Sequence, residues 1–385
     1  MKRKKRNTIL GDNVAAAGKP NNSEKEPNAA DCKQKGTEED VRKSADGAMK
    51  GTDGAMVKGT EEDVQKGADD AMRKGTAVVV KHTGSHYMLS CLPQWKPFVA
   101  VVRGKLRLKG TSSTNPIAVG DVVDFQGDAF NGFTITGIHD RKNCIVRRST
   151  NLSRQNHVIA ANIDRVFLVV TLKDPEIKLQ FVDRFLVTCE AYGVPVTILL
   201  NKTDLYKDEE LSQIAAGFVL LYRQAGYQVI ETSVETGYNI PQLKNLCKDK
   251  VVLFSGQSGV GKSSLVNALD PSLNLKTAEI SQAHLQGRHT TTFYQMHPLS
   301  CGGFVVDTPG IRGFGLVDFS KEELSNYFPE MLKIEDNCRF VPCTHTHEPG
   351  CAVKEAVEKE EISPLRYASY LAMLEDDGKY READE

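Results

Sequence analysis

The sequence has no long hydrophobic run and no large excess of charge. None of its apolar stretches approaches the roughly 20 residues that a helix needs to cross a bilayer, so we expect no membrane partner. The formal net charge at pH 7 is -1, which excludes a protein that is basic overall, so any contact with RNA must come from local basic patches. The 385 residues, 40% of them hydrophobic, are sufficient for two or three compact domains.

Large apolar side chains are also nearly absent from residues 1–75. This tract is rich in Gly, Ala, Lys and Glu, and the string GTEEDV begins at Gly36 and again at Gly59. Such a segment cannot bury a core, so we predict a disordered tail that contains repeats. It has no apolar stretch typical of a secretion signal, and its early acidic residues disfavour an organelle-targeting sequence. For the basic start, residues 1–6, contact with RNA is the alternative.

A glycine-rich loop with a lysine and a serine lies between a predicted strand and a predicted helix. Residues 254–265 read FSGQSGVGKSSL, which satisfies the G-x-x-x-x-G-K-[ST] spacing of a phosphate-binding loop. In such loops glycines let backbone N–H groups turn toward the phosphates, while Lys262 neutralises the β and γ oxygens and the Ser263 hydroxyl reaches Mg2+. The apolar run 251–254 predicts the strand before the loop, and residues 264–269 predict the helix after it. We predict nucleotide contacts at Gly256, Gln257, Ser258, Gly259, Val260, Gly261, Lys262, Ser263 and Ser264.

A second buried-strand pattern, residues 194–200, ends at an Asn-Lys-Thr-Asp tetrapeptide. The carboxyl ends of parallel strands are where ligands bind in doubly wound folds. There, the Asp204 carboxylate can accept hydrogen bonds from both N1–H and the 2-amino group of guanine, and adenine offers no such donor pair. We therefore predict GTP as the ligand, with Asn201, Lys202 and Asp204 at the guanine.

A weaker signal for the guanine site lies in residues 233–235, Ser-Val-Glu. They follow the apolar stretch 227–230, which predicts another buried strand. In GTPases the turn in this position makes the last guanine contact, so Ser233 and Val234 join the predicted site.

Two candidate switch elements follow the phosphate loop. Residues 304–306 predict a strand that ends in Asp-Thr-Pro-Gly, where Asp307 can hold Mg2+ through water and the Gly310 N–H can contact the γ-phosphate. Before that strand, residues 287–292 read GRHTTT, and we predict that Thr291 completes the Mg2+ shell when the γ-phosphate is present. A solvated threonine-rich loop is the alternative for this string.

The residue after this motif is Ile311, an apolar side chain that cannot orient the attacking water. We therefore predict slow unassisted hydrolysis. His289, beside the threonines, is the candidate from this chain for orienting the water, and Lys262 and Thr291 complete the predicted catalytic set. The alternatives are that a partner supplies this group, or that His289 is an ordinary solvated loop residue.

The order of these motifs is circularly permuted, because the guanine motifs precede the phosphate loop and the switches. Permutation is tolerable since domain termini usually lie close together at the surface. With its GQSGVGKSSL loop and its G-x-H-T-T-T string, the chain from about residue 76 onward resembles the ribosome-small-subunit-dependent GTPase family, RsgA. The resemblance implies a cytoplasmic GTP hydrolase that binds the small ribosomal subunit and its rRNA and assists late maturation of the subunit. We expect a monomer.

Three of the nine cysteines are clustered with a histidine near the C-terminus. The spacing C-x4-C-x-H-x5-C is formed by Cys338, Cys343, His345 and Cys351. It suits one tetrahedral structural Zn2+, with His347 as an alternative ligand. The other cysteines are scattered, which fits a reducing cytosol where such a cluster binds metal more often than it forms disulfides. The same spacing belongs to the RsgA resemblance, which implies a small zinc-supported helical domain with predicted helices at residues 352–360 and 364–375.

Residues 76–148 are rich in short β patterns separated by Gly, Pro and Asn turns. We predict strands at residues 77–81, 87–91, 98–102, 121–125 and 133–138. Such a number of short strands suggests a small closed barrel, and the RsgA resemblance implies that it is an OB-fold, a frequent oligonucleotide binder.

Basic residues in and after the predicted barrel offer a surface for RNA. Four cations alternate with Gly and Leu and would share one face of a strand: Arg103, Lys105, Arg107 and Lys109. A second basic cluster comprises Arg141, Lys142, Arg147 and Arg148. Ordinary solvated charge is the alternative for either cluster. Tyr87 and Trp95 can stack on bases, but packing explains them more readily.

The sequence thus predicts four parts: a disordered tail (1–75), an OB-fold RNA-binding domain (76–150), a circularly permuted α/β P-loop GTPase domain (151–318) and a zinc-binding helical domain (319–385). The predicted cofactors are Mg2+ and one structural Zn2+, with GTP as substrate. Two other functions stay open: a GTP-gated RNA-binding assembly scaffold, and a GTPase that acts on another RNA. Activation by a monovalent cation is open too, because Ser258 and Gly259 stand where many related permuted GTPases carry Pro and Asn.

Overall fold

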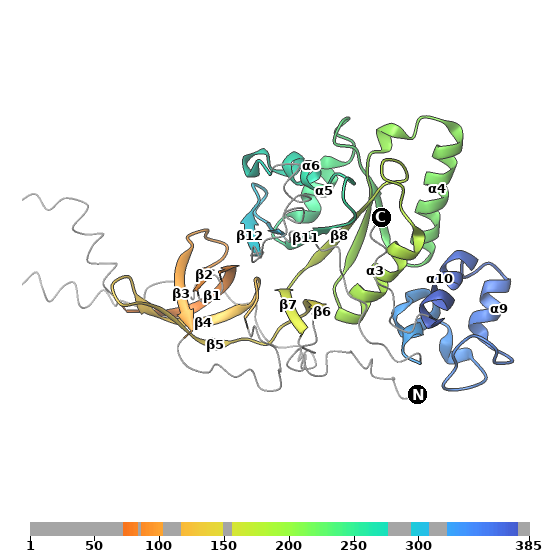
Figure 1. The fold of residues 1–385 in the computed structure, drawn as a ribbon, viewed down its shortest axis with the longest axis horizontal. Helices are drawn as coiled ribbons and strands as arrows, with labels where there is room; N and C mark the ends of the chain where they lie inside the picture. The colour runs from red at the N-terminus through yellow and green to blue at the C-terminus, as the bar shows by residue number, and fades with distance from the viewer. Residues whose placement is uncertain are drawn as a thin grey trace, which may run out of the picture.

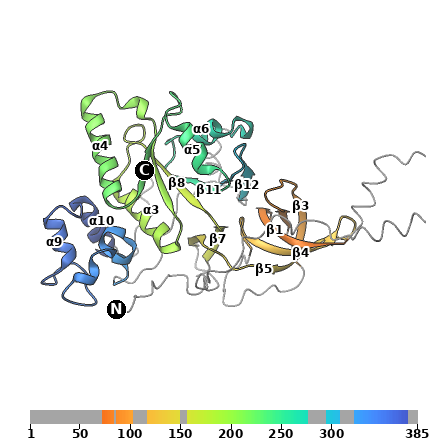
Figure 2. The ribbon, with the colours of Figure 1, turned by 180° about the vertical axis from the view of Figure 1, so that it is seen from behind.

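A computed structural model describes residues 72–83, 86–102, 117–148, 156–275, 294–307 and 322–375. These residues form a β-barrel, an α/β domain and a small helical domain, and the barrel and the helical domain lie at opposite ends of the α/β domain (Figure 1, and from behind in Figure 2). The predicted tail lies outside the described residues as far as residue 71. So does the predicted RNA-binding stripe of Arg103, Lys105, Arg107 and Lys109.

The barrel is closed by five strands. They are β1 (Arg73–His82), β2 (His86–Ser90), β3 (Phe98–Val102), β4 (Val122–Asp128) and β5 (Gly132–Ile138). They are paired in the order β1-β2-β3-β5-β4, β4 returns to β1, and only the β3–β5 pair is parallel. Alternate side chains face inward, so that β4 buries Val123 and Phe125 in a core shared with Val79 and Leu89. The predicted five-stranded barrel is confirmed.

The two aromatic residues considered for base stacking are used for packing. Tyr87 is buried in the barrel core. The Trp95 ring lies 5.8 Å from the ring of Phe304, a residue of the α/β domain, so this side chain packs the barrel against its neighbour. The packing interpretation is confirmed for both residues.

A two-stranded ribbon, β6 (Cys144–Arg148) and β7 (Asn156–Ala161), links the barrel to the α/β domain. A bridge from Val119 to Ala160 attaches it to the barrel side. The sequence does not reveal the ribbon, because Arg147 and Arg148 obscure its apolar pattern. The ribbon crosses the predicted boundary at residue 150, and the four domain divisions stay predictions.

Arg141 does not belong to an exposed basic cluster, since its side chain is only 6% exposed. Its Nε and Nη2 donate to the two carboxylate oxygens of Asp121 at 2.7 Å each. Asp121 also accepts a hydrogen bond from the backbone N–H of Ala118 at 2.7 Å. The pair therefore fixes the loop that precedes β4.

We expect Arg141→Met to lower the free energy of unfolding by about 3 kcal/mol, because it leaves the buried Asp121 carboxylate without its counter-charge. Urea denaturation of the full chain measures this effect. Lys142→Met is the matched control, since Lys142 is 62% exposed in its ion pair with Asp164 and its loss should cost less than about 1 kcal/mol. Equal effects of the two substitutions would contradict the expectation.

The α/β domain contains one six-stranded sheet. Its order is β10 (Gln228–Glu231), β9 (Val196–Leu200), β8 (Arg165–Val170), β11 (Val251–Ser255), β13 (Phe304–Asp307) and β12 (Gln295–Pro298). All neighbours are parallel except β12, which is antiparallel to β13. The four buried strands predicted from the sequence are β9, β10, β11 and β13.

Helices cover both faces of this sheet, as Figure 1 shows: α3 (Leu179–Tyr192) and α4 (Glu209–Gln224) on one, α5 (Ile240–Cys247) and α6 (Lys262–Leu269) on the other. Strand β8 shows why both faces must be covered. Val166 and Leu168 join the core with α3 and α4, whereas Phe167 and Val169 join the core with α5 and α6. Short 3-10 turns at Thr203–Leu205 and Pro271–Leu273 complete the domain.

The barrel continues the sheet of the α/β domain through a single pair of residues. Lys81 of β1 pairs with Gln295 of β12, and Gln295 also pairs with Asp307 at the end of β13. The barrel is thereby attached to β12, the strand that follows the predicted threonine switch. Strand β12 in turn pairs with β13, which ends at Asp307.

The C-terminal part is built of short helices: α8 (Pro329–Leu332), α9 (Ala352–Glu358) and α10 (Pro364–Glu375), with 3-10 turns at Leu324–Tyr327 and Glu335–Asn337. The two helices predicted here are α9 and α10. Their core cluster includes Phe328, Cys338 and Tyr370 together with Val187 and Ala191 of α3. Helix α3 therefore belongs to the cores of two parts of the chain.

Among the described residues no helix combines the length and the apolar character that crossing a membrane would require.

Candidate nucleotide site and metal centre

The glycine-rich loop lies between the end of β11 and the start of α6, at the carboxyl edge of the sheet. Gly256 has a φ of 141°, and a Cβ there would lie 2.2 Å from the carbonyl oxygen of Val169. Gly261 has a φ of 95°, and a Cβ there would lie 2.6 Å from Nδ2 of Asn201. Both positions thus require glycine, and the N-terminus of α6, which has no side-chain cap, is open to an anion.

The lysine of the loop lies against the loop's own backbone. Lys262 Nζ donates to the carbonyl oxygens of Gly256 at 2.9 Å and Gln257 at 2.5 Å. Ser263 is buried in the first turn of α6. Phosphate oxygens can compete for the same ammonium protons, and the predicted phosphate contact of Lys262 stays a prediction.

Asn201 joins the guanine motif to the phosphate loop. Its buried Nδ2 donates to the carbonyl oxygen of Val260 at 2.8 Å, and its Oδ1 accepts from the Thr232 hydroxyl at 3.0 Å. Its own carbonyl oxygen accepts from the Tyr206 hydroxyl at 2.8 Å. Two segments that are 59 residues apart in the chain are therefore fixed to each other at the edge of the sheet.

The carboxylate of the guanine motif is aligned by the turn after β10. The Ser233 hydroxyl donates to Asp204 Oδ1 at 2.5 Å, and the Thr203 backbone N–H donates to the carbonyl oxygen of Thr232. A carboxylate held in this way can accept both guanine donors at once. The structure thus brings Asn201, Asp204 and Ser233 together, as the sequence predicts.

A further loop, residues 171–177 between β8 and α3, lies between the guanine motif and the phosphate loop. Lys202 Nζ donates to the carbonyl oxygen of Asp174 at 2.5 Å. A Cβ on Gly259 would lie 3.5 Å from Pro175, so this loop lies close to the phosphate loop. No motif in the sequence marks this loop, although its position directly after a buried strand places it at the same sheet edge.

The remaining predicted nucleotide and magnesium residues are described only in part. Asp307 ends β13, beside β11 and therefore near the phosphate loop, but its side chain is not among those described. Thr291, His289 and Gly310 lie outside the described residues. Their predicted roles stay predictions.

Comparisons with known proteins agree with this geometry. The family model described as RsgA GTPase matches residues 138–317. The protein named small ribosomal subunit biogenesis GTPase RsgA from Flavobacterium psychrophilum is 51% identical over 306 residues, which are 78% of this chain and 93% of that protein. The protein of the same name from Bacteroides fragilis is 50% identical over 309 residues, or 79% and 98% of the two chains. The chain belongs to the RsgA GTPase family.

Solved structures support the same assignment. YjeQ from Thermotoga maritima has a TM-score of 0.65 and 34% identity and covers 78% of this chain and 98% of its own. YloQ, which is described as a circularly permuted GTPase, has a TM-score of 0.62 and 29% identity over 78% and 94%. The RsgA-family chain is therefore a GTP hydrolase, and its barrel and permuted GTPase fold are as predicted.

The Cys/His cluster of the C-terminal part has the geometry of a metal centre. The ligand atoms of Cys338, Cys343, His345 and Cys351 all lie within 4.8 Å of one another. His345 Nδ1 lies 3.6 Å from Cys338 Sγ and 3.4 Å from Cys351 Sγ, and these two sulfurs are 3.9 Å apart. A tetrahedral zinc thiolate site needs sulfurs about 3.8 Å apart, so the donor set fits Zn2+. His347, the alternative ligand, is exposed and lies outside this cluster.

The loop that carries His345 is held by a carboxylate and by two tyrosines. Glu348 accepts hydrogen bonds from the Thr344 N–H and hydroxyl and from the Thr346 N–H. Burial alone would raise the pKa of Glu348, but these hydrogen bonds lower it to about 2. From α10, the Tyr370 hydroxyl donates to the carbonyl oxygen of Thr344 at 2.7 Å and the Tyr367 hydroxyl donates to that of His345 at 2.6 Å. These contacts fix the backbone of the loop on both sides of the histidine.

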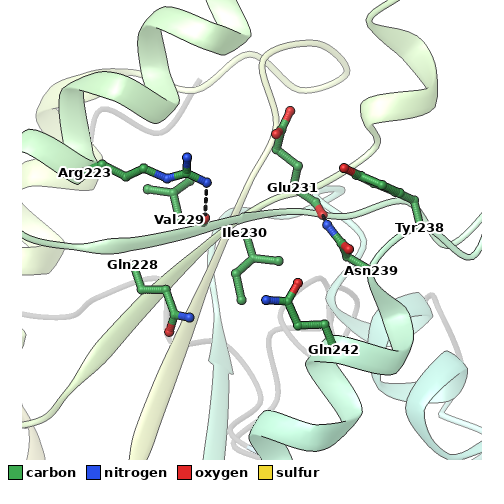
Figure 3. A pocket seen from close by; sticks show the side chains of 8 residues that line it. All are labelled: Arg223, Gln228, Val229, Ile230, Glu231, Tyr238, Asn239 and Gln242. Atoms are coloured by element: carbon green, nitrogen blue, oxygen red, sulfur yellow. Dashed lines mark hydrogen bonds between the residues drawn. The ribbon is translucent and has the colours of Figure 1, made fainter.

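The pocket drawn in Figure 3 lies along the edge strand β10, and none of the predicted nucleotide or zinc residues lines it. Arg223 Nη2 donates to the carbonyl oxygen of Val229 at 3.2 Å, and Asn239 Nδ2 donates to that of Glu231 at 2.9 Å. These side chains bond to backbone groups that a further strand would otherwise use. These two carbonyl groups of the edge strand are therefore already hydrogen-bonded within the chain, which disfavours pairing with another strand.

Proposed function

We propose that this RsgA-family GTPase binds the small ribosomal subunit and assists its late maturation, with GTP turnover that the subunit stimulates. The observation that carries the proposal is the guanine motif fixed to the phosphate loop through Asn201 and Val260, in a chain about 50% identical to proteins named for small-subunit biogenesis. We further propose that it acts in the cytoplasm as a monomer and contacts rRNA through its barrel.

The proposed chemistry is divided among three groups of residues. Guanine is read by Asn201, Lys202, Asp204 and the turn at Ser233 and Val234, and the phosphates are bound along residues 256–264 with Gly310 at the γ-phosphate. Ser263, Thr291 and Asp307 would hold Mg2+, which neutralises charge on the β- and γ-phosphates. One Zn2+ would be held by the Cys/His cluster and serves structure, because four protein ligands leave no open position for catalysis.

The attachment of the barrel supports a switch mechanism. The threonine switch leads directly into β12, and Gln295 at the start of β12 pairs with both Lys81 of the barrel and Asp307 of β13. Ordering of the switches by GTP would therefore fix the barrel on rRNA, and hydrolysis would weaken that contact and release the protein.

Small ribosomal subunits should raise GTP turnover strongly, whereas large subunits and ATP should not support it. Turnover of the purified full chain with GTP or ATP, with and without each subunit, measures this. Tight GTP binding without stimulation by small subunits would contradict the proposed partner and leave a GTPase that acts on another RNA.

His289→Ala should lower GTP turnover by roughly 100-fold if the imidazole orients the attacking water, because general-base and water-orienting groups contribute about that much. Single-turnover hydrolysis with and without small subunits measures the effect. His297→Ala on β12 serves as a control histidine outside the switch. Unchanged rates in His289→Ala would remove this residue from the mechanism and assign the water-orienting group to a partner.

A further inference from the structure

Arg366 of α10 is the largest fully buried side chain among the described residues. Its Nη1 donates to Asp183 Oδ1 at 2.6 Å, and its Nε donates to Glu330 Oε1 at 2.7 Å. Asp183 and Glu330 are buried as well, with side chains 2% and 7% exposed. Burial alone would lower the pKa of Arg366, but the charges of Asp183 and Glu330 raise it, so the guanidinium stays charged.

This buried charge cluster joins the two parts of the chain that share α3. Asp183 lies on α3 of the GTPase domain, whereas Glu330 lies on α8, whose Met331 shares a core with Cys338 and Cys351. The Tyr222 hydroxyl of α4 donates to the same Asp183 oxygen at 2.9 Å, and the Phe328 ring lies 4.6 Å from the guanidinium carbon. A buried ion cluster adds little net stability compared with apolar packing, but it fixes one relative position of the elements that carry it.

The same turn of α10 also holds the zinc loop. Tyr367 and Tyr370, next to Arg366 on this helix, donate to the carbonyl oxygens of His345 and Thr344. One helical segment therefore contacts the metal-binding loop on one side and α3 on the other.

Helix α3 leads back to the nucleotide site. The loop of residues 171–177 precedes it, and Asp183 lies within its first turns. The carbonyl oxygen of Asp174 in this loop accepts a hydrogen bond from the Lys202 ammonium of the guanine motif, and Pro175 lies close to Gly259 of the phosphate loop. If the position of α3 is fixed, the loop of residues 171–177 is fixed with it. This loop lies between the guanine motif and the phosphate loop.

We propose that Arg366 is a positioning residue which, through Asp183 and α3, couples zinc binding in the C-terminal part to nucleotide binding in the GTPase domain. The proposal rests on the proposed nucleotide and zinc sites. Coupling of this kind is reciprocal, so zinc must tighten nucleotide binding by the same factor by which the nucleotide tightens zinc binding. A purely structural Arg366 would change the stability of the chain but would leave this factor intact.

The test measures both affinities in a thermodynamic cycle with the full chain. Binding of a fluorescent GDP analogue with Mg2+ is titrated with and without zinc, and zinc binding is titrated by competition with a chromophoric chelator with and without GDP. In the wild type we expect zinc to tighten GDP binding by roughly 5- to 150-fold, the usual range for coupled sites, and GDP to tighten zinc binding equally.

Three variants separate positioning from folding. Arg366→Met should bind GDP as weakly with zinc as without it, whereas Arg366→Lys should restore part of the coupling. Asp183→Asn removes the partner's charge at nearly constant shape and should also lower the coupling factor. Arg339→Met is the control, because Arg339 is an exposed cation of the same part of the chain that stacks on Phe340.

Three outcomes would overturn the proposal. First, if removal of zinc changes the GDP affinity of the wild type by less than twofold, the two sites are not coupled. GDP binding in that experiment would still show that the nucleotide site is intact. Coupling preserved in both Arg366→Met and Asp183→Asn would exclude the Arg366 route. No GDP binding by the zinc-loaded wild type would overturn the nucleotide site, and the coupling with it.

Discussion

Asp204→Asn should exchange GTP for xanthosine triphosphate as the preferred nucleotide. A carboxylate accepts hydrogen bonds from both guanine N1–H and the 2-amino group. In Asp204→Asn the amide NH2 would face the 2-amino group, and because both groups are donors no hydrogen bond can form. Xanthine carries a carbonyl oxygen in place of the 2-amino group, and this oxygen can accept a hydrogen bond from the amide NH2. Loss of the carboxylate leaves the guanine 2-amino group and the amide NH2 as buried donors without partners. We therefore expect GTP affinity to fall by roughly 100- to 10,000-fold.

Competition of unlabelled GTP and xanthosine triphosphate against a fluorescent nucleotide measures the exchange. The environment of Asp204 supports it, since the Ser233 hydroxyl that donates to Oδ1 at 2.5 Å can donate equally to an amide oxygen and hold the new side chain in place. Asp208→Asn is the matched control, because Asp208 caps α4 through the Leu211 N–H only a short distance along the chain. A variant that still prefers GTP would show that Asp204 does not read the base.

The sequence predicts most of the GTPase domain because its signals are local. A strand, a glycine-rich loop and a helix occur in order at residues 251–269, and the backbone of the loop needs glycine at Gly256 and Gly261 for reasons that any phosphate loop shares. The zinc ligands are predicted for the same reason: Cys338 and His345 are close in the chain, and the short loop between them brings them together.

What the sequence does not show depends on contacts between distant segments. Arg141 looks like one of several surface cations, and only the fold places it beside Asp121, 20 residues earlier in the chain. Arg366 and Asp183 are 183 residues apart, and no local pattern links them. The loop of residues 171–177 has no sequence motif, and only the fold shows that the carbonyl oxygen of Asp174 accepts a hydrogen bond from Lys202. Long-range pairs of this kind are also the ones that join the parts of the chain into one mechanism.

Loss of zinc should have the largest effect on stability, and it should unfold the C-terminal part. Helices α8, α9 and α10 are too short to persist alone, and Cys338 and Cys351 contribute directly to the core that they share. Structural zinc contributes about 10 kcal/mol or more to the folding of small metal domains. We therefore expect Cys351→Ser to lose bound zinc and to expose residues 322–375 to protease.

Limited proteolysis with mass spectrometry, together with the zinc content per chain, measures both effects. Cys301→Ser is the control, since Cys301 is half-buried and lies outside the cluster, and it should keep one zinc per chain and full protection. Because Val187 and Ala191 of α3 lie in the same core, cleavage in zinc-free protein should also extend to sites near α3, while the barrel strands β1 to β5 stay protected. Protection of residues 322–375 in zinc-free Cys351→Ser would mean that apolar packing against α3 holds this part without metal.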